Sequence, residues 1–345
     1  MDWLPVGVVA GALALSALLT FLAGKLGERA GIVDQPGGRR LHGGSVSRLG
    51  GLGLAVAFIA VAFGLFLWAP LRPEHYRPML GVLGGAVFVC LGGLADDRWQ
   101  FKSGPQFVLQ IGSAVIAILA TVWIQVVTLP FIGIRTFEWY ITYPITILWI
   151  MGMMNTVNFL DGLDGLAAGV GAIAALLFAL HSFRLEQKEI ALYSLALAGA
   201  CLGFLIFNFH PARVFLGSAG AMTLGYALGT LSILAPARVA TALLVMAVPI
   251  ADTAFQIYDR WRHGRSPLQG DRGHLHYRLL DLGLSQRQIV VVYWAFCAVF
   301  GTLALLIPSI YKLPVLVLLG LIVVGALRWL TTRTQPPGPP GPPAP

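Results

Sequence analysis

Long apolar stretches separated by short polar loops recur along the whole chain. Each stretch covers about 15–22 residues, close to the ~20 that a helix needs to cross a hydrocarbon core of about 30 Å. Their approximate centres are residues 14, 59, 87, 117, 148, 172, 199, 227, 247, 299 and 321. The pattern predicts an all-α integral membrane protein, a polytopic bundle of about 11 transmembrane helices.

The domain organisation follows from the loop lengths and from the C-terminal composition. No loop is long enough to fold as a separate soluble domain, so we expect residues 1–334 to form one multi-span membrane domain. Residues 336–345 contain only proline, glycine and alanine. Their collagen-like triplets are too few for a stable triple helix. We therefore interpret residues 335–345 as a disordered tail and assign it no function.

Composition and charge support the membrane class and indicate an orientation. Apolar residues make up 57% of the 345 residues and charged residues 11%, against roughly 25% charged in soluble domains. Seven of the 23 Lys and Arg residues fall in loops on one predicted side and the other 16 on the opposite side. By the positive-inside rule, the side with 16 is cytoplasmic. We therefore expect the N-terminus outside and the C-terminus in the cytoplasm.

The first apolar stretch is not expected to be a signal peptide. The leading segment, residues 1–3, contains no Lys or Arg, and the first basic residue is Lys25, after the stretch. A signal peptide has a positively charged segment before its apolar region. We therefore interpret the stretch as the first membrane helix.

Two amides and two carboxylates follow one another at intervals of three residues between two predicted helices. They are Asn155, Asn158, Asp161 and Asp164. Ionisable side chains are unfavourable in hydrocarbon, so at a membrane span they indicate a functional site by default. A polar helix cap at the membrane surface is the alternative interpretation of this segment alone.

A second acidic group, the adjacent pair Asp96 and Asp97, ends the third predicted span. Neighbouring residues on a helix point about 100° apart, so one carboxylate can face a metal or a substrate while the other pairs elsewhere. The pair lies on the same predicted side of the membrane as Asp161 and Asp164. We therefore take all four carboxylates as candidate catalytic residues.

Basic residues gather in two loops on this side. The loop of residues 25–51 contains Arg39, His42 and Arg48. Arginine forms bidentate hydrogen bonds with phosphate, so this loop suits an anionic substrate. A charge signal that only sets membrane topology is the alternative interpretation.

The second basic loop, residues 258–285, is the longest one. It contains several arginines, including Arg272, and the pair His274 and His276. A His-x-His pair could hold a metal, but no third soft ligand is near it in the sequence. We prefer the interpretation that the imidazoles hydrogen-bond an anionic substrate.

A tight glycine-bearing turn, residues 207–221, opens a further predicted helix. It contains Asn208 and Ser218. Backbone N–H groups at a helix start favour phosphate, and a plain turn between helices is an equal alternative. Together with the acidic and basic groups, this turn predicts a substrate site on the cytoplasmic face.

Hard oxygen ligands, basic loops and a bilayer together favour one chemistry. Carboxylate and amide oxygens are the ligands that Mg²⁺ prefers, with substrate phosphates completing its shell. The same side carries the arginines. The combination predicts phosphoryl transfer from a soluble phosphorylated donor to a lipid acceptor.

Five motifs in order resemble those of the polyprenyl-phosphate N-acetylhexosamine-1-phosphate transferase superfamily (glycosyltransferase family 4). The chain looks most like its bacterial undecaprenyl-phosphate GlcNAc-1-phosphate transferase branch. The resemblance covers about residues 30–290. The motifs are Asp34-x-Pro36-x-x-Arg39-x-x-His42, Asp96-Asp97, Asn155-x-x-Asn158-x-x-Asp161-Gly-x-Asp164-Gly, Phe215-x-Gly217 and Asp271-Arg-x-His274-x-His276.

The resemblance implies a reaction, a cofactor and partners. A sugar 1-phosphate, with GlcNAc as the expected sugar, passes from a UDP-N-acetylhexosamine to undecaprenyl phosphate, and UMP is released. Mg²⁺ is the implied metal, with Mn²⁺ as an alternative, and Asn158 and Asp161 are its implied ligands. The implied location is the bacterial plasma (inner) membrane, in a cell-envelope glycan pathway, with the active site facing the cytoplasm. No nucleic-acid partner is expected, and a homodimer is compatible with the sequence.

The residues implied to bind substrate are spread over the cytoplasmic loops. They are Arg39, His42, Arg48, Asn155, Asn208, Arg272, His274 and His276. The His-x-His loop is associated with recognition of the nucleotide-sugar donor in this branch.

Two departures from the family pattern bear on activity. Ser218 stands where the family has a metal-binding Asp, and Gln106 stands where a Lys is common. A hydroxyl removes one negative charge from a divalent-metal site, so the sequence predicts weaker Mg²⁺ binding, which Ser218→Asp would strengthen. A catalytically impaired relative that only binds nucleotide sugar or lipid phosphate is the alternative function.

A secondary transporter is the third hypothesis. Transporters place polar sites near the bilayer midplane, in broken helices related by a repeat. Here the polar residues lie at helix ends on one side and no repeat is visible, so we disfavour a transporter.

Overall fold

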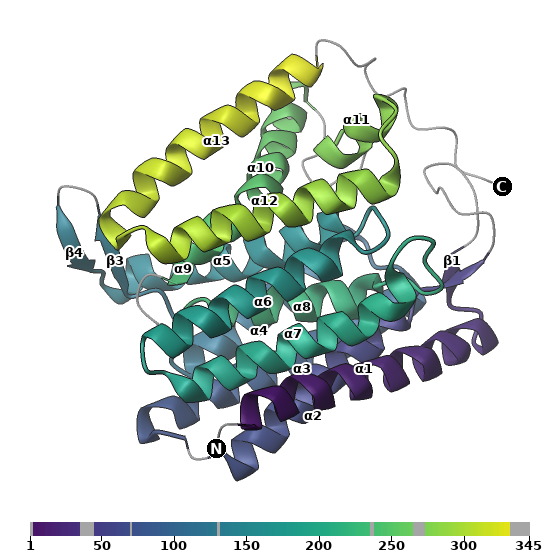
Figure 1. Ribbon diagram of the computed structural model, residues 1–345, viewed down its shortest axis with the longest axis horizontal. Helices are drawn as coiled ribbons and strands as arrows, with labels where there is room; N and C mark the ends of the chain where they lie inside the picture. Colours follow the sequence, from purple (N-terminus) through teal and green to yellow (C-terminus); the bar gives the residue numbers. More distant parts are fainter. Residues whose placement is uncertain are drawn as a thin grey trace.

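Helices dominate the computed structural model, which describes residues 3–34, 45–69, 71–129, 132–234, 238–264 and 273–331. Many of the long helices lie side by side (Figure 1). The first half contains α1 (Leu4–Arg29), β1 (Val33–Asp34), β2 (Val46–Ser47), α2 (Gly50–Trp68), α3 (Pro73–Trp99), α4 (Ser103–Leu119), β3 (Val126–Leu129), β4 (Gly133–Thr136) and α5 (Trp139–Leu160). The second half contains α6 (Leu166–Arg184), α7 (Lys188–Asn208), α8 (Gly217–Leu231), α9 (Arg238–Val245), α10 (Ala247–Arg262), α11 (Leu275–Asp281), α12 (Gln286–Leu306) and α13 (Ser309–Thr331).

The structure confirms a polytopic helical membrane protein, but it does not confirm eleven spans. Within the described residues, seven helices are long and apolar enough to cross a membrane, and an eighth span results if α9 and α10, bent by 80°, count as one. Every predicted centre falls within a helix. However, α4 has 17 residues and α8 has 15, fewer than the ~20 needed for a full crossing.

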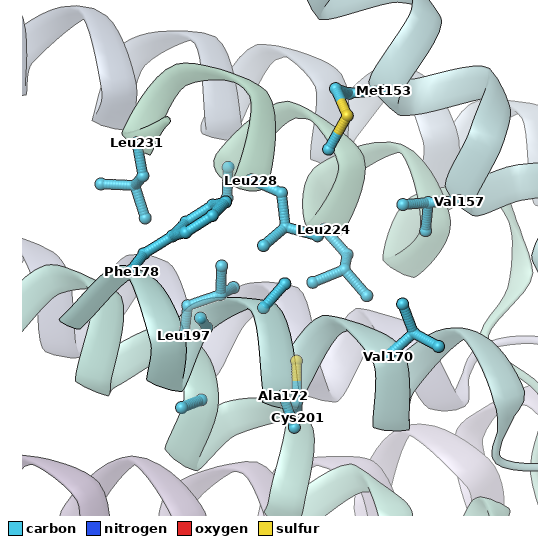
Figure 2. Close-up of a cluster of buried hydrophobic side chains, with 14 of the residues drawn as sticks. Met153, Val157, Val170, Ala172, Phe178, Leu197, Cys201, Leu224, Leu228 and Leu231 are labelled. Atoms are coloured by element: carbon cyan, nitrogen blue, oxygen red, sulfur yellow. The ribbon is translucent and has the colours of Figure 1, made fainter. Parts of the chain in front are cut away.

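Helix α8 forms the centre of the bundle. It packs against α2, α3, α5, α6 and α7, and every one of its residues from Ser218 to Leu231 is buried. Figure 2 shows side chains of α5, α6, α7 and α8 meeting in one apolar cluster, with Leu224 and Leu228 between Met153 and Cys201. A short helix can occupy this position because neighbouring helices, and not lipid, cover its whole surface.

Small glycines allow the close approach of α8 to its neighbours. A Cβ atom at Gly93 of α3 would lie 2.6 Å from the Cα atom of Ala219, and one at Gly51 of α2 would lie 1.9 Å from the carbonyl oxygen of Leu216. Such distances are far below van der Waals contact. The first turn of α8 is therefore held tightly between α2 and α3.

Two small antiparallel sheets, which the helical pattern did not predict, lie at opposite ends of the bundle (Figure 1). Strand β1 pairs with β2 through Val33 and Ser47, and Ser47 also bridges Val214. Strands β3 and β4 form a hairpin between α4 and α5. The β1–β2 sheet joins the first loop to the turn before α8, and this end of the bundle holds the site.

Candidate active site

A cavity of about 710 Å³ opens at the β1 end of the bundle. It is lined by residues from the β1–β2 region, the α5–α6 loop and the turn before α8, together with Tyr277 and Gln286. Six of the residues predicted from the sequence to act in catalysis, metal binding or substrate binding line it. They are Arg48, Asn158, Asp161, Asp164, Asn208 and Ser218.

The α5–α6 loop carries the acidic residues into the cavity. Helix α5 runs further than the sequence pattern predicted and ends at Leu160, so Asn158 lies on its last turn and Asp161 is its C-terminal cap. Gly165, the N-cap residue before α6, has φ +80°, a conformation that favours glycine. The side chain of Asn208 accepts a hydrogen bond from the Gly165 N–H (2.9 Å) and donates one to the Val214 carbonyl (2.9 Å). Asn208 therefore fixes the acidic loop to the turn before α8.

Asp161 lies in an electrostatically unfavourable position. Burial raises the pKa of its carboxyl well above the usual value, and the charges of Asp97 and Asp164 raise it further. Arg48 and the backbone of Gly217 oppose this shift. Two neighbouring carboxylates and one arginine leave an excess of negative charge, which a bound cation would relieve.

Asp164 is paired with His210, which no sequence motif predicted as a site residue. Its Oδ2 atom lies 2.8 Å from Nδ1 of His210 and accepts a hydrogen bond from the Ala212 N–H at 3.0 Å. Both residues line the cavity. A histidine two residues after Asn208 in a polar turn was the available signal, but only the tertiary structure brings it to Asp164.

Asp97 holds the start of α8 from the neighbouring helix α3. Its two oxygens accept hydrogen bonds from the N–H groups of Ser218 (2.7 Å) and Ala219 (3.0 Å). The first N–H groups of a helix have no partner within the helix, so this carboxylate acts as a cap supplied from outside. Gly217 has φ +61°, and a Cβ atom there would lie 2.8 Å from Asp97 Oδ1. Asp97 is 2% exposed and is not among the cavity-lining residues.

Asn155 faces α4 and not the cavity. Its amide exchanges hydrogen bonds with Gln110, with Asn155 donating at 2.8 Å and Gln110 donating at 3.3 Å, and it also donates to the Met151 carbonyl. The residue is therefore part of a contact between helices, one turn before Asn158. Its predicted role in substrate binding stays a prediction.

His274 and His276 form a buried stack beside the acidic loop. Their rings are 5.6 Å apart and nearly parallel at 9°. Burial lowers the pKa of His276 to about 3, against the attraction of Asp252, so its imidazole is neutral at physiological pH. A Cβ atom at Gly162 would lie 2.6 Å from His276 Nε2. The pair thus lies behind the cavity wall, and neither ring is among the lining residues.

Asp252 of α10 holds this histidine pair in place, a role that no sequence motif predicted. One carboxylate oxygen lies 2.9 Å from His274 Nδ1, and the other accepts the Leu275 N–H at 2.9 Å. Asp252 is 3% exposed. An acidic residue within an otherwise apolar segment was a signal for it. Because a carboxylate accepts hydrogen bonds, Nδ1 of His274 is the donor in this contact.

The donor set of the cavity fits a magnesium ion that also binds substrate. Among the described residues, no three His, Cys, Asp or Glu side chains are grouped closely enough to form a protein cage for a metal. Mg²⁺ is usually held by one or two carboxylates, with substrate phosphates and water as the other ligands. Asp161 and the Asn158 amide offer such oxygens on one wall of the cavity. The site therefore fits a metal that arrives with a phosphorylated substrate.

Three residues predicted to bind substrate lie outside the described part of the chain. They are Arg39, His42 and Arg272. The Pro- and Gly-rich tail, residues 335–345, also lies outside it. Their predicted roles stay predictions.

A family profile and several known proteins are similar in sequence to this chain. The sequence profile of glycosyl transferase family 4 matches residues 79–236. A probable undecaprenyl-phosphate N-acetylglucosaminyl 1-phosphate transferase of Bacillus subtilis is 30% identical over 85% of this chain and 82% of its own length. A decaprenyl-phosphate N-acetylglucosaminephosphotransferase of Mycolicibacterium smegmatis is 34% identical over 83% of this chain and 79% of its own. A phospho-N-acetylmuramoyl-pentapeptide-transferase of Moorella thermoacetica is 34% identical over 75% of this chain and 84% of its own length.

Proposed function

Because the chain belongs to glycosyl transferase family 4, we propose that it transfers N-acetylhexosamine 1-phosphate from a UDP-sugar to a polyprenyl phosphate. GlcNAc is the proposed sugar and undecaprenyl phosphate the proposed acceptor. The relatives named above, whose names specify undecaprenyl or decaprenyl phosphate, support this choice. The observation that carries the proposal is the cavity that joins Asp161 and Asn158 to Arg48 and Arg213 at one end of a membrane bundle.

The proposed reaction exchanges one phosphoanhydride bond for another. An oxygen of the lipid phosphate attacks the phosphorus that carries the sugar, and the bond from that phosphorus to the oxygen of UMP breaks. Arg48 and Arg213 line the cavity and suit the phosphates of the donor. The catalysis that we propose is largely positioning and charge stabilisation, as is general for phosphoryl transfer.

We propose Asn158 and Asp161 as the protein ligands of Mg²⁺. The bound ion would neutralise charge on the donor phosphates. Asp164, held by His210 and the Ala212 N–H, keeps the acidic loop in place. For Asp96 and Asp97 we propose that they position or deprotonate the lipid phosphate. The negative charge of Asp97 raises the pKa of Asp161. This electrostatic influence supports a role for Asp97 near the reacting groups.

We propose that the cavity faces the cytoplasm of a bacterial plasma membrane. The basic residues Arg48, Arg213 and Arg287 lie at the cavity end, as the positive-inside rule requires for this side. With the N-terminus outside and the C-terminus inside, the number of crossings is odd. Eleven crossings result if α4, α5, α8 and the bent pair α9–α10 each add one crossing to the seven long apolar helices.

The direct test measures UMP release by purified protein supplied with UDP-GlcNAc, undecaprenyl phosphate and Mg²⁺. Parallel reactions with UDP-GalNAc and with decaprenyl phosphate compare sugars and lipids. The binding-only alternative is favoured by Ser218, whose hydroxyl donates a hydrogen bond to Asp96 and adds no charge to the metal site. That alternative predicts binding of UDP-GlcNAc without release of UMP.

Removal of the metal is expected to abolish turnover. With two protein oxygens as ligands, the ion should exchange freely, so EDTA should reduce UMP release to background and added Mg²⁺ should restore it. Mn²⁺ should also restore activity. The measurement is a titration of UMP release with each cation after EDTA treatment. Full activity in EDTA would contradict the metal assignment.

Loss of the carboxylate that holds His274 is expected to weaken donor use selectively. Asp252→Asn removes a charged partner of the imidazole, worth about 1.5–3 kcal/mol for a charge-assisted bond. The donor KM should rise about tenfold or more, with a smaller change for the lipid acceptor. Asp259→Asn, on the same helix but paired with His263, serves as the control. Equal changes in both KM values would contradict a role in donor recognition.

A further inference from the structure

Asp96 receives hydrogen bonds from two other helices and from the α3–α4 connection. Gln106 Nε2 of α4 donates to both carboxylate oxygens, at 3.1 and 3.0 Å. The Ser218 hydroxyl of α8 donates to Oδ2, and the Phe101 N–H donates to Oδ1 at 2.7 Å. Asp96 is 3% exposed. The carboxylate therefore joins α3, α4 and α8 through neutral donors.

The same turn of α8 is also held by the neighbouring carboxylate. Asp97 accepts the N–H groups of Ser218 and Ala219, so two buried carboxylates converge on one residue, Ser218. In the part of the chain that the structure describes, neither forms an ion pair with a Lys, Arg or His side chain. Arg48 attracts the charge of Asp97 from beyond ion-pair distance. Buried carboxylates without a close ion pair depend on such donors, because an unsatisfied charge is costly in a buried site.

Ser218 and Gln106, the two departures from the family pattern, therefore meet at the same carboxylate. A Lys at 106 and an Asp at 218 would contribute one positive and one negative charge, whereas Gln106 and Ser218 contribute none. The net charge beside Asp96 is the same for either pair. Changing only one member would alter this charge by one unit in a buried place, where it is weakly screened.

We propose that Gln106 and Ser218 are a coupled pair of positioning residues, which hold the start of α8 against α3 through Asp96. The pair keeps Asp96 hydrogen-bonded without adding charge next to Asp97. The kinetic consequence of this inference rests on the proposed function, whereas its structural consequence does not.

The coupling reverses what the sequence alone predicts for position 218. An aspartate there accepts hydrogen bonds and donates none, so Ser218→Asp removes a donor from Asp96 and places a third carboxylate beside Asp96 and Asp97. The variant should be impaired on its own. Adding Gln106→Lys supplies an ammonium group with three donors, which can bridge Asp96 and the new carboxylate.

A double-mutant cycle tests the coupling. Wild type, Ser218→Asp, Gln106→Lys and the double variant are compared by thermal unfolding in EDTA and by UMP release in Mg²⁺. Ser218→Asp should lower Tm by about 4 °C or more, and the double variant should recover most of that loss. At a temperature well below every Tm, Ser218→Asp should lower kcat about tenfold or more with little change in donor KM, and Gln106→Lys should restore it.

A second cycle with Ser218→Ala is the matched control, because it removes the same hydroxyl without adding charge. Gln106→Lys should give no comparable rescue of Tm in that background. Equal effects of Gln106→Lys in the wild-type and Ser218→Asp backgrounds would overturn the proposal. Coupling in Tm with no UMP release from any variant, wild type included, would support the proposal while refuting the proposed function.

Discussion

Replacing Asp161 by asparagine is expected to reduce UMP release by about two orders of magnitude or more, the scale typical of lost positioning or acid–base groups. The change keeps the size of the side chain and removes its charge. Asp161 lines the cavity beside Asp164. The negative charges of Asp97 and Asp164 repel the ionised form of its carboxyl. Relief of this repulsion should leave Tm in EDTA unchanged or higher, so a loss of activity would come from chemistry and not from unfolding.

The Asp161 comparison needs a measurement of metal dependence and a control. The Mg²⁺ concentration for half-maximal rate should rise in Asp161→Asn if any activity remains. Asp281→Asn, at the exposed end of α11 and not among the cavity-lining residues, should keep a rate within about twofold of wild type. A near-normal rate for Asp161→Asn, with matched expression and Tm, would refute its role as a metal ligand.

Replacing Asp97 by alanine is expected to damage stability and activity together. The change leaves the N–H groups of Ser218 and Ala219 without the acceptor that they have now. Loss of such a cap costs about 1–2 kcal/mol, and burial on α3 should bring the loss to the upper end of that range. UMP release should fall by about two or more orders of magnitude, because the turn of Gly217 forms part of the cavity wall.

The isosteric change Asp97→Asn separates the two contributions. Asparagine keeps one acceptor oxygen for the start of α8 but has no charge. A stable but inactive Asp97→Asn protein would show that the charge itself is required, as expected for a group that positions or deprotonates the lipid phosphate. If Asp97→Ala matched wild type in both Tm and rate, the cap and the catalytic assignment would both be wrong.

Apolar periodicity and motif spacing determined much of the site in advance. The helices at all eleven predicted centres follow from local hydrophobicity, which responds to burial whether lipid or protein provides it. For the same reason the pattern could not separate α8, which is enclosed by other helices, from a lipid-facing span. The candidate site residues Arg48, Asn158, Asp161, Asp164, Asn208 and Ser218 do meet at one cavity, as their shared membrane side indicated.

The partners of the polar side chains were decided only by the tertiary structure. Asp97 capping α8, Gln110 pairing with Asn155 and Asp252 holding His274 each join residues that are 22 or more positions apart. Sequence spacing reports which side of one helix a residue occupies, but not which neighbouring helix faces it. Sequence alone therefore identified the family and the acidic and basic groups. Whether a given polar residue lines the cavity or stabilises the wall behind it depended on how the helices pack around α8.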